Sequence, residues 1–370
     1  METRTLTIAA TATSDDEAIR IAGRALAEGQ LVVFPTETVY GLGTSAADAR
    51  AVADLSRLKE RPPDKPFTFH LADPGEAERY AGPLSPLARR FIRKAWPGPL
   101  TLVVPDRRGT SEGPPAPAEE AIYYDHTVGL RCPSHKAGRA ILRAAGVPVV
   151  ATSANLGGRP APRRAPEALA QLAGKVHLVV DAGPTPLAAA STVVRLRPDD
   201  TYEVLREGAV AGSRVARMAT TRVVFVCTGN QCRSPMAAGL ARLRLAERLG
   251  TSPDALPGCG VEITSVGTAA GAGYPASANA IRAMADAGVD IRSHMSRPMT
   301  IDVLRSADYI WVMTGAHYEA VARLAPEANV ALLDPSGREV ADPVGGDIEQ
   351  YRACARHLDA ALAQRVAEIV

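Results

Sequence analysis

Cysteine is scarce in this chain, which contains five cysteines among 370 residues. An odd and sparse set does not provide the paired disulfide framework of small secreted proteins, so we expect a reducing compartment. The sequence also lacks two Cys-x-x-Cys pairs, the spacing that is typical of a structural zinc site. We therefore predict no metal site.

Long apolar runs are absent as well. Runs such as LVVF at 31–34 and VVFV at 223–226 have the length of a strand and are too short to span a bilayer. The first twenty residues contain no basic segment followed by a long apolar one, so we expect no signal peptide. A net charge of only +2 does not by itself imply a large polyanion-binding surface, although the 42 Lys and Arg residues could still cluster locally. These features predict a cytoplasmic protein without a membrane partner.

The chain does contain the composition of an ordinary globular protein, with 46% hydrophobic and 22% charged residues. Stretches with helical spacing alternate with short strand-like runs in both halves, the order that is typical of α/β folds. We predict two α/β domains, residues 1–208 and 221–370, joined by a linker at 209–220 where the composition becomes small and basic. The Gly- and Pro-rich segment 106–121 is predicted to be a mobile loop.

One contiguous motif, VVFVCTGNQCRSPM at 223–236, carries the strongest chemical signal. A buried strand leads into Cys227, and a helix then begins near Arg233, Ser234 and Pro235. Backbone N–H groups at such a helix start point toward one anion-sized position, and the Arg233 guanidinium can close over it. The same positive potential favours the thiolate of Cys227. A nucleophile inside a phosphate cradle predicts phosphoryl transfer onto sulfur.

This motif resembles the signature of the low-molecular-weight protein-tyrosine-phosphatase family, and the resemblance covers essentially all of 221–370. It implies a parallel-sheet fold, a general acid at Asp342 in ADPVGGDIEQY, and a Ser234 hydroxyl that stabilises the leaving thiolate. ALLDPSG offers a rival acid at Asp334. The resemblance also implies that Cys232 can form a protective disulfide with Cys227. A polar network would support the phosphate loop through Asn230, Ser265 and His294.

The substrate of this half is less defined by the sequence. The resemblance implies a protein phosphomonoester such as phosphotyrosine. However, Val344 and two glycines follow the Asp-Pro pair where phosphotyrosine enzymes carry aromatic residues, and the motif is also similar to the protein-arginine-phosphatase branch. Gln231 stands where that branch has Thr. Phosphotyrosine and phosphoarginine therefore both stay open.

The N-terminal half lacks the G-x-x-x-x-G-K-[ST] loop, so any ATP site here is not a P-loop. Its polar motifs are dispersed instead. They are PTETVYGLG (35–43), KERPPDKPFTFH (59–70), WPGPLTLV (96–103), TVGLRCP (127–133), TSANLGGRPAP (152–162), STVV (191–194) and LREGA (205–209).

Taken in order, these motifs resemble the YrdC/Sua5 family of threonylcarbamoyl-AMP synthases across roughly residues 13–209. The resemblance implies a twisted mixed sheet with helices, and a reaction in which L-threonine, bicarbonate and ATP give threonylcarbamoyl-AMP and pyrophosphate. Mg²⁺ would accompany ATP, and no tightly bound cofactor is expected. The product would pass to tRNA and the threonylcarbamoyl-transferase machinery. Threonine would be bound by Thr38, His70, Arg131, Ser153 and Ser191. ATP would be bound by Lys59, Arg61, Lys65, Thr127, Asn155, Arg163 and Arg206.

A different interpretation of the same half is a nucleotide- or RNA-binding paralogue with little synthase activity. The complete set of cations at 59–65, together with Ser153 and Asn155, favours a working enzyme. Longer members of the family append another domain through a linker over the active site, and the sequence leaves open whether 209–220 acts as a lid.

Overall fold

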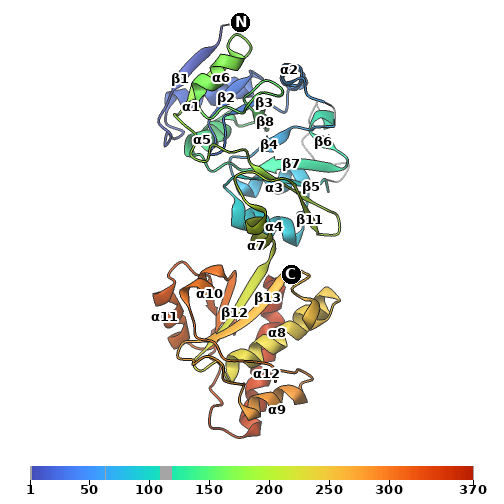
Figure 1. Ribbon diagram of the computed structural model, residues 1–370, viewed down its shortest axis with the longest axis vertical. Helices are drawn as coiled ribbons and strands as arrows, with labels where there is room; N and C mark the ends of the chain where they lie inside the picture. The colour runs from blue at the N-terminus through green and yellow to red at the C-terminus, as the bar shows by residue number, and fades with distance from the viewer. Residues whose placement is uncertain (1, 63, 109–118, 370) are drawn as a thin grey trace. The chain divides into compact units, whose positions relative to one another are not determined.

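We describe a computed structural model of the chain, which defines residues 2–62, 64–108 and 119–369 (Figure 1). Most of the predicted loop at 106–121 therefore lies outside the described residues. The chain separates into two compact units, Met1–Ala219 and Thr220–Val370. Each unit is a layered α/β structure, which confirms the predicted fold class.

The first unit is built on one large mixed sheet. Its described strands follow the order β1-β9-β2-β3-β8-β4-β7-β5-β10-β11, and β6 pairs with β7. The strands are β1 Arg4–Thr7, β2 Val32–Phe34, β3 Gly41–Ser45, β4 Thr68–His70, β5 Leu100–Pro105, β6 Tyr123–Tyr124, β7 Thr127–Arg131, β8 Val149–Ser153, β9 Leu178–Asp181, β10 Thr192–Leu196 and β11 Tyr202–Arg206.

Helices cover both faces of this sheet because successive strand residues point to opposite sides. In β2, Val32 and Phe34 enter the core under α1 and α5, whereas Val33 enters the core under the other helices. These helices are α1 Glu17–Ala27, α2 Ala49–Lys59, α3 Ala77–Ala81, α4 Pro86–Ala95, α5 Lys136–Ala145, α6 Ala165–Leu172 and α7 Gly212–Ala219.

The segment 209–220, which we expected to be a linker, mostly forms helix α7. Val215, Met218 and Ala219 follow the i, i+3, i+4 spacing of one helix face and are buried in the core of the first unit. The buried Arg90 of α4 donates a hydrogen bond to the carbonyl oxygen of Ala219. The first unit therefore extends to the end of α7.

The second unit contains a parallel sheet with the described strand order β13-β12-β14-β15. Its strands are β12 Thr221–Cys227, β13 Val261–Gly267, β14 Tyr309–Val312 and β15 Val330–Leu332. Its helices are α8 Arg233–Leu249, α9 Ala278–Asp286, α10 Ile301–Ser306, α11 Gly315–Leu324 and α12 Ile348–Arg365.

Alternation along β12 decides where the predicted nucleophile lies. Phe225 and Cys227 face the core that α8, α9 and α12 cover, whereas Val224 and Val226 face α10 and α11. Cys227 is the last residue of the strand, so its side chain emerges where the chain turns toward the start of α8. None of the helices among the described residues is long and apolar enough to cross a membrane.

Candidate active sites

A cavity of about 860 Å³ lies over the central strands of the first unit. Alternation again explains it: Leu100, Leu102 and Val104 of β5 are buried in the core, while Thr101 and Val103 line the cavity. The same period places polar side chains of β4, β7 and β10 on this face. Six cationic side chains and only two carboxylates, Glu60 and Asp64, line the cavity. The cations are Lys59, Arg61, Lys65, Arg131, Arg195 and Arg206.

Arg131, at the end of β7, is the most constrained of these cations and is 6% exposed. Its Nη2 donates to Glu37 Oε1 at 2.9 Å and to Thr38 Oγ1 at 2.6 Å. The second oxygen of Glu37 accepts the backbone N–H of Ser134. The Nε of Arg131 is buried and has no hydrogen-bond partner among the described residues. The Nη2 group of this guanidinium is therefore fixed, while Nε retains an unsatisfied donor that suits a carboxylate.

Lys59 ends helix α2 and fastens the loop that follows β8. Its Nζ donates to the carbonyl oxygen of Ser153 at 2.9 Å and to Asn155 Oδ1 at 3.2 Å. Ser153 Oγ donates to the same amide oxygen at 2.5 Å. Burial, with a smaller contribution from the nearby Arg61, lowers the pKa of Lys59 to about 8. Lys59 therefore supports the site chiefly by holding Ser153 and Asn155 in place.

Arg61 organises the rest of the 59–70 motif. Its guanidinium lies over the ring of Phe67 at 4.4 Å and donates to the carbonyl oxygen of Pro66 at 2.5 Å. It also reaches Thr152 Oγ1 at 3.3 Å and the carbonyl oxygen of Lys65. Burial lowers the pKa of Arg61 to about 10, which leaves it charged at neutral pH. The loop is thus folded back on itself, with Lys65 at the cavity wall.

His70 adds an uncharged hydrogen-bonding group to this cationic cavity. Burial and the neighbouring Arg131 lower the pKa of His70 to about 3, so the ring is neutral at physiological pH. Its Nδ1 lies 3.1 Å from the carbonyl oxygen of Thr68, which can only accept. The proton therefore resides on Nδ1, and Nε2 is an acceptor.

Ser191 and Arg206 form the opposite wall. Ser191 Oγ lies 2.9 Å from Thr101 Oγ1, and Arg206 Nη2 donates to the carbonyl oxygen of Ser191 at 2.9 Å. Ser191 precedes β10 and Arg206 ends β11, and these neighbouring antiparallel strands bring the two residues together.

Ten of the twelve predicted ligands line this cavity. Thr38 lies behind Arg131 and orients it, while the exposed Arg163 does not line the cavity. The backbone of Arg163 is held by Glu167 and Thr185. Sequence reasoning missed Glu37 and Arg195. Glu37 lies inside the quoted PTETVYGLG motif, and Arg195 interrupts an apolar strand at the same phase as Val193, a signal that could have marked it.

In the second unit, the Cys227 side chain is 2% exposed and lies at the base of the loop between β12 and α8. Ser234 Oγ lies 3.0 Å from its sulfur, and the backbone N–H of Asn230 points to the sulfur at 3.3 Å. The Asn230 N–H donates to the sulfur, and the Ser234 hydroxyl is within hydrogen-bond distance of it, at the N-terminus of α8.

Asn230 holds this loop in shape and is fully buried with a φ of 54°, a conformation that Asn tolerates better than most residues. Its side-chain nitrogen donates to Ser234 Oγ at 2.8 Å and to Ser265 Oγ at 2.9 Å. Its side-chain oxygen accepts the backbone N–H of Arg297, and its carbonyl oxygen accepts His294 Nε2 at 2.7 Å. The three predicted supporting residues therefore meet in one network.

Arg233 opens α8 and forms an ion pair with Asp342. It also donates to the carbonyl oxygen of Val340 and to Thr228 Oγ1, each at 3.3 Å. Its Nε is buried without a hydrogen-bond partner among the described residues. The Asp342 side chain is 38% exposed, at the mouth of the site. An incoming anion would find a free donor on Arg233 and a carboxylate that it can displace.

The rival carboxylate, Asp334, occupies a different environment. It is 4% exposed, and its oxygens accept from Ser336, from His357 Nε2 at 2.7 Å and from Arg338. These partners, Ser336 foremost, lower its pKa. Because its oxygens already accept these hydrogen bonds, Asp334 stabilises the turn after β15 and is a poor proton donor.

Cys232 lies within this loop, and His317 contacts it through Thr228. Cys232 Sγ lies 3.2 Å from Tyr351 OH and 3.4 Å from Ser277 Oγ. His317, which sequence reasoning missed, places Nε2 at 2.9 Å from Thr228 Oγ1. Burial and the adjacent Arg233 lower the pKa of His317. Its TGAH stretch at 314–317, at the start of a helix, was the available signal.

The fold and the sites together define a two-domain α/β protein with an electropositive ligand cavity in one unit and a cysteine-based anion loop in the other. Comparison with known families agrees with this description. The Sua5/YciO/YrdC family model, described as telomere recombination, matches residues 24–208, and the low molecular weight phosphotyrosine protein phosphatase model matches residues 222–370. The chain belongs to the Sua5/YciO/YrdC family and carries a low-molecular-weight phosphatase domain.

Among curated relatives, the threonylcarbamoyl-AMP synthase of Bacillus subtilis is 34% identical over 227 residues, covering 61% of this chain and 64% of that protein. The chain thus spans less than two thirds of that relative. A putative threonylcarbamoyl-AMP synthase of Mycobacterium tuberculosis is 39% identical over 196 residues, covering 52% of this chain and 85% of that protein. The structure of P. abyssi Sua5 complexed with L-threonine is 21% identical, covers 98% of each chain and gives a TM-score of 0.51, which shows a shared fold.

Proposed function

We propose that the first unit makes threonylcarbamoyl-AMP and pyrophosphate from L-threonine, bicarbonate and ATP. The observation that carries this proposal is the half-satisfied Arg131 guanidinium beside a neutral His70, in a cavity whose other cations can neutralise a triphosphate. The names of the relatives above support the same reaction. A nucleotide-binding paralogue without synthesis would not need a buried arginine poised for an amino-acid carboxylate.

Each group has a defined role in this proposal. Arg131 Nε binds the threonine carboxylate, and Nε2 of His70 accepts a hydrogen bond from the threonine hydroxyl or amine. Bicarbonate and the threonine amine give a carbamate with loss of water. A carbamate oxygen then attacks the α-phosphorus of ATP, and the bond to pyrophosphate breaks.

Charge on the departing pyrophosphate is stabilised by Arg61, Lys65 and Arg195. Mg²⁺ would reach the cavity with ATP and neutralise phosphate charge. Among the described residues, no group of three or more His, Cys, Asp or Glu side chains is arranged to hold a metal ion.

The test is pyrophosphate release by the full chain. We expect release only when threonine, bicarbonate and ATP are all present, and the new nucleotide should incorporate labelled bicarbonate. Pyrophosphate release that persists without threonine would show ATP hydrolysis instead and would contradict the synthase proposal.

We further propose that the product is consumed by transfer to tRNA, with the downstream transferase machinery as partner, in the cytoplasm.

We propose that the second unit hydrolyses protein phosphomonoesters through a phosphocysteine. The arrangement of Ser234 Oγ and the Asn230 N–H on Cys227 sulfur carries this proposal. The sulfur attacks phosphorus while Asp342 protonates the leaving oxygen, so an S–P bond forms as the P–O bond breaks. Water then attacks phosphorus, Asp342 accepts its proton, and the thiolate leaves with a hydrogen bond from Ser234. Binding of the phosphate by Arg233 would break the Arg233–Asp342 ion pair and free the acid.

Phosphotyrosine is the proposed substrate, with phosphoarginine as the second candidate. The second candidate is favoured by the absence of an aromatic side chain at 343–350 and by Val344, which is 70% exposed beside the acid. Hydrolysis of a phosphotyrosine peptide and of the matched phosphoarginine peptide should be compared on the full chain. A kcat/KM at least about tenfold higher for phosphotyrosine supports the first candidate, and the reverse ratio supports the second.

A further inference from the structure

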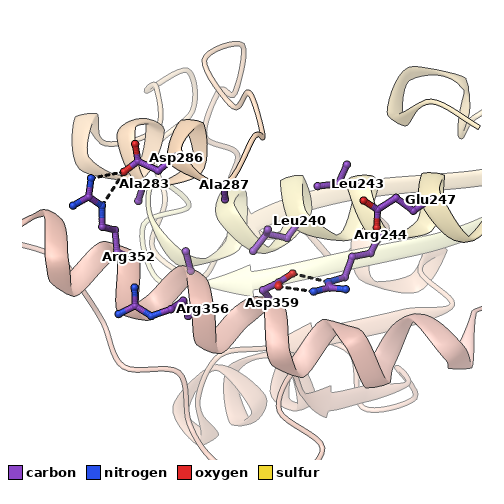
Figure 2. A pocket seen from close by; sticks show the side chains of 11 residues that line it. Leu240, Leu243, Arg244, Glu247, Ala283, Asp286, Ala287, Arg352, Arg356 and Asp359 are labelled. Atoms are coloured by element: carbon purple, nitrogen blue, oxygen red, sulfur yellow. Dashed lines mark hydrogen bonds and ion pairs between the residues drawn. The ribbon is translucent and has the colours of Figure 1, made fainter.

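Two cavities of the second unit lie outside the Cys227 loop, and they differ in how their arginines are paired. Figure 2 shows the first, of about 500 Å³, lined by residues of α8, α9 and α12. Arg244 forms two parallel bonds to Asp359, and Arg352 forms two bonds to Asp286 at 2.8 and 2.6 Å. The charges of Arg244 and Arg352 are neutralised by the protein itself, and the third arginine of the lining, Arg356, is exposed. This cavity therefore offers no pair of unneutralised guanidinium groups to an anion.

The second cavity, of about 540 Å³, lies between α8 and the segment 288–297. Arg242 and Arg297 both line it, and neither forms an ion pair with a carboxylate of the described residues. The Arg242 guanidinium is half-buried, and its hydrogen-bond partner within residues 2–62, 64–108 and 119–369 is the carbonyl oxygen of Ile263, to which it donates at 2.8 Å. Two carboxylates also line the cavity: Asp290 is paired with Arg292, and the exposed Asp254 lies near Arg242. We call this space the Arg242–Arg297 cavity.

Two neighbouring guanidinium groups in a partly enclosed space repel each other. Burial lowers the pKa of Arg242, and Arg297 lowers it further, against the opposite effect of Asp254. Such an arrangement is relieved when an anion with several oxygens binds both cations. The remaining wall contains the apolar Val289 and Ile291 together with His294, whose pKa is lowered chiefly by burial.

The same wall supports the catalytic loop from behind. Three residues that line the cavity are the partners of Asn230: Ser265 through its hydroxyl, His294 through Nε2, and Arg297 through its backbone N–H. Asn230 in turn orients Ser234 and the cysteine sulfur. A ligand in the cavity would therefore act on the catalytic loop through one residue.

We propose that the Arg242–Arg297 cavity binds a compact polyanion of the phosphate class, and that its occupancy tightens the Asn230 network and raises turnover at Cys227. The regulatory part rests on the proposed phosphatase function. By bridging α8 and the 294–297 segment, the ligand would hold together the two elements between which Asn230 is clamped. The reaction proposed for the first unit releases such a polyanion, pyrophosphate, which is the probe we choose.

The experiment measures hydrolysis of p-nitrophenyl phosphate by the full chain over a range of pyrophosphate concentrations. Pyrophosphate also competes at Cys227 and raises KM, so kcat is the diagnostic quantity. We expect kcat of the parent to rise at least about twofold and kcat of Arg297→Ala not to respond. Arg356→Ala is the matched control, because Arg356 is exposed in the other cavity and should leave the parent response intact. A response shared by Arg297→Ala, or no response in any protein, overturns the regulatory proposal.

A second measurement separates this proposal from the phosphatase proposal. In an Arg233→Ala background, which weakens binding at the catalytic loop, the histidine ring signals of the full chain are followed by NMR. The His294 signal, assigned with His294→Gln, should shift on addition of pyrophosphate, and the shift should vanish when Arg297→Ala is added. If the parent lacks phosphatase activity while the Arg233→Ala protein shows this shift, the proposed phosphatase function is refuted and the proposed binding site is retained. An unmoved His294 signal would refute the binding site itself.

Discussion

The two sites are built in opposite ways. The thiol, the loop amides and the arginine of the second unit come from one stretch of eight residues, 227–234, whereas the cavity of the first unit collects side chains from Thr36 to Arg206. In the second unit, a strand, a tight loop and a helix start position the site by local backbone geometry. In the first unit, the order and register of the sheet position the cavity residues, because β4, β7, β5 and β10 are neighbours in space but scattered in the chain.

The pairing of the cations differs as well. Arg233 is held by a partly exposed carboxylate that a phosphate can displace, while Lys59, Arg61 and Arg206 are held by carbonyl oxygens. Charge in the cavity is therefore shared among several groups. We expect single substitutions to reduce activity by larger factors at the Cys227 loop than in the cavity of the first unit.

A large loss of turnover is expected when the proposed general acid, Asp342, is replaced, and this loss distinguishes Asp342 from the rival carboxylate, Asp334. Asp342→Ala should slow p-nitrophenyl phosphate hydrolysis by roughly 10²–10⁴ because no group would protonate the leaving oxygen. Phosphocysteine should still form and be detectable after acid quench. Asp334→Ala should leave turnover closer to the parent but lower the melting temperature, since it removes the buried partner of Ser336 and His357. A larger loss of turnover in Asp334→Ala would assign the acid to the other loop.

A smaller loss of activity is expected when Arg61, one of the several cations that line the cavity, is replaced. Arg61→Ala should reduce threonine- and bicarbonate-dependent pyrophosphate release at least about tenfold, through loss of a charge-assisted contact. Arg163→Ala is the matched control, since this exposed side chain does not line the cavity, and it should change release less than about twofold. If the two variants show equal losses, the triphosphate lies outside the cavity as we describe it.

Much of this organisation was predictable from the sequence, and the failures have physical causes. The Cys227 loop was predictable because spacing alone fixes it. The cavity ligands came from family resemblance, since nothing local relates Thr127 to Ser191. Arg195 was missed because one cation in an apolar strand gives no sign of which face it occupies until the sheet order is known. The small, basic composition of 209–220 obscured α7, although Val215, Met218 and Ala219 have helical spacing.

A redox difference between the units should be smaller still. Cys227, whose sulfur accepts the backbone N–H of Asn230, should react first with peroxide, and Cys232 should capture the resulting sulfenic acid as a disulfide, with release of water. This requires Cys232 to leave its contacts with Tyr351 and Ser277. After peroxide and then dithiothreitol, Cys232→Ser should recover a few-fold less phosphatase activity than the parent. Equal recovery would leave Cys232 as a packing residue. Pyrophosphate release should be unchanged, because none of the proposed cavity ligands is a cysteine.

The mildest effect concerns pH in the cavity. With a pKa of about 8, lowered mainly by burial, Lys59 carries its charge below this pH and loses it above. The charged fraction of Lys59 should fall roughly tenfold as the pH rises from 7 to 9. Pyrophosphate release should decline less, by about two- to threefold, because Lys59 acts on the site through Ser153 and Asn155. Lys59→Arg should flatten this decline because its guanidinium stays charged, whereas Lys65→Arg should keep it. A decline that persists in Lys59→Arg would assign it to another group.

The central claim is that one chain carries two chemically independent active sites. Both activities should be measured on the same preparations of the full-length parent, Cys227→Ser and Arg131→Ala. We predict that Cys227→Ser loses p-nitrophenyl phosphate hydrolysis by at least about 10⁴ while retaining threonine-dependent pyrophosphate release. Arg131→Ala should lose that release and retain the hydrolysis. If either substitution abolished both activities in a folded protein, the account of two separate sites would be contradicted.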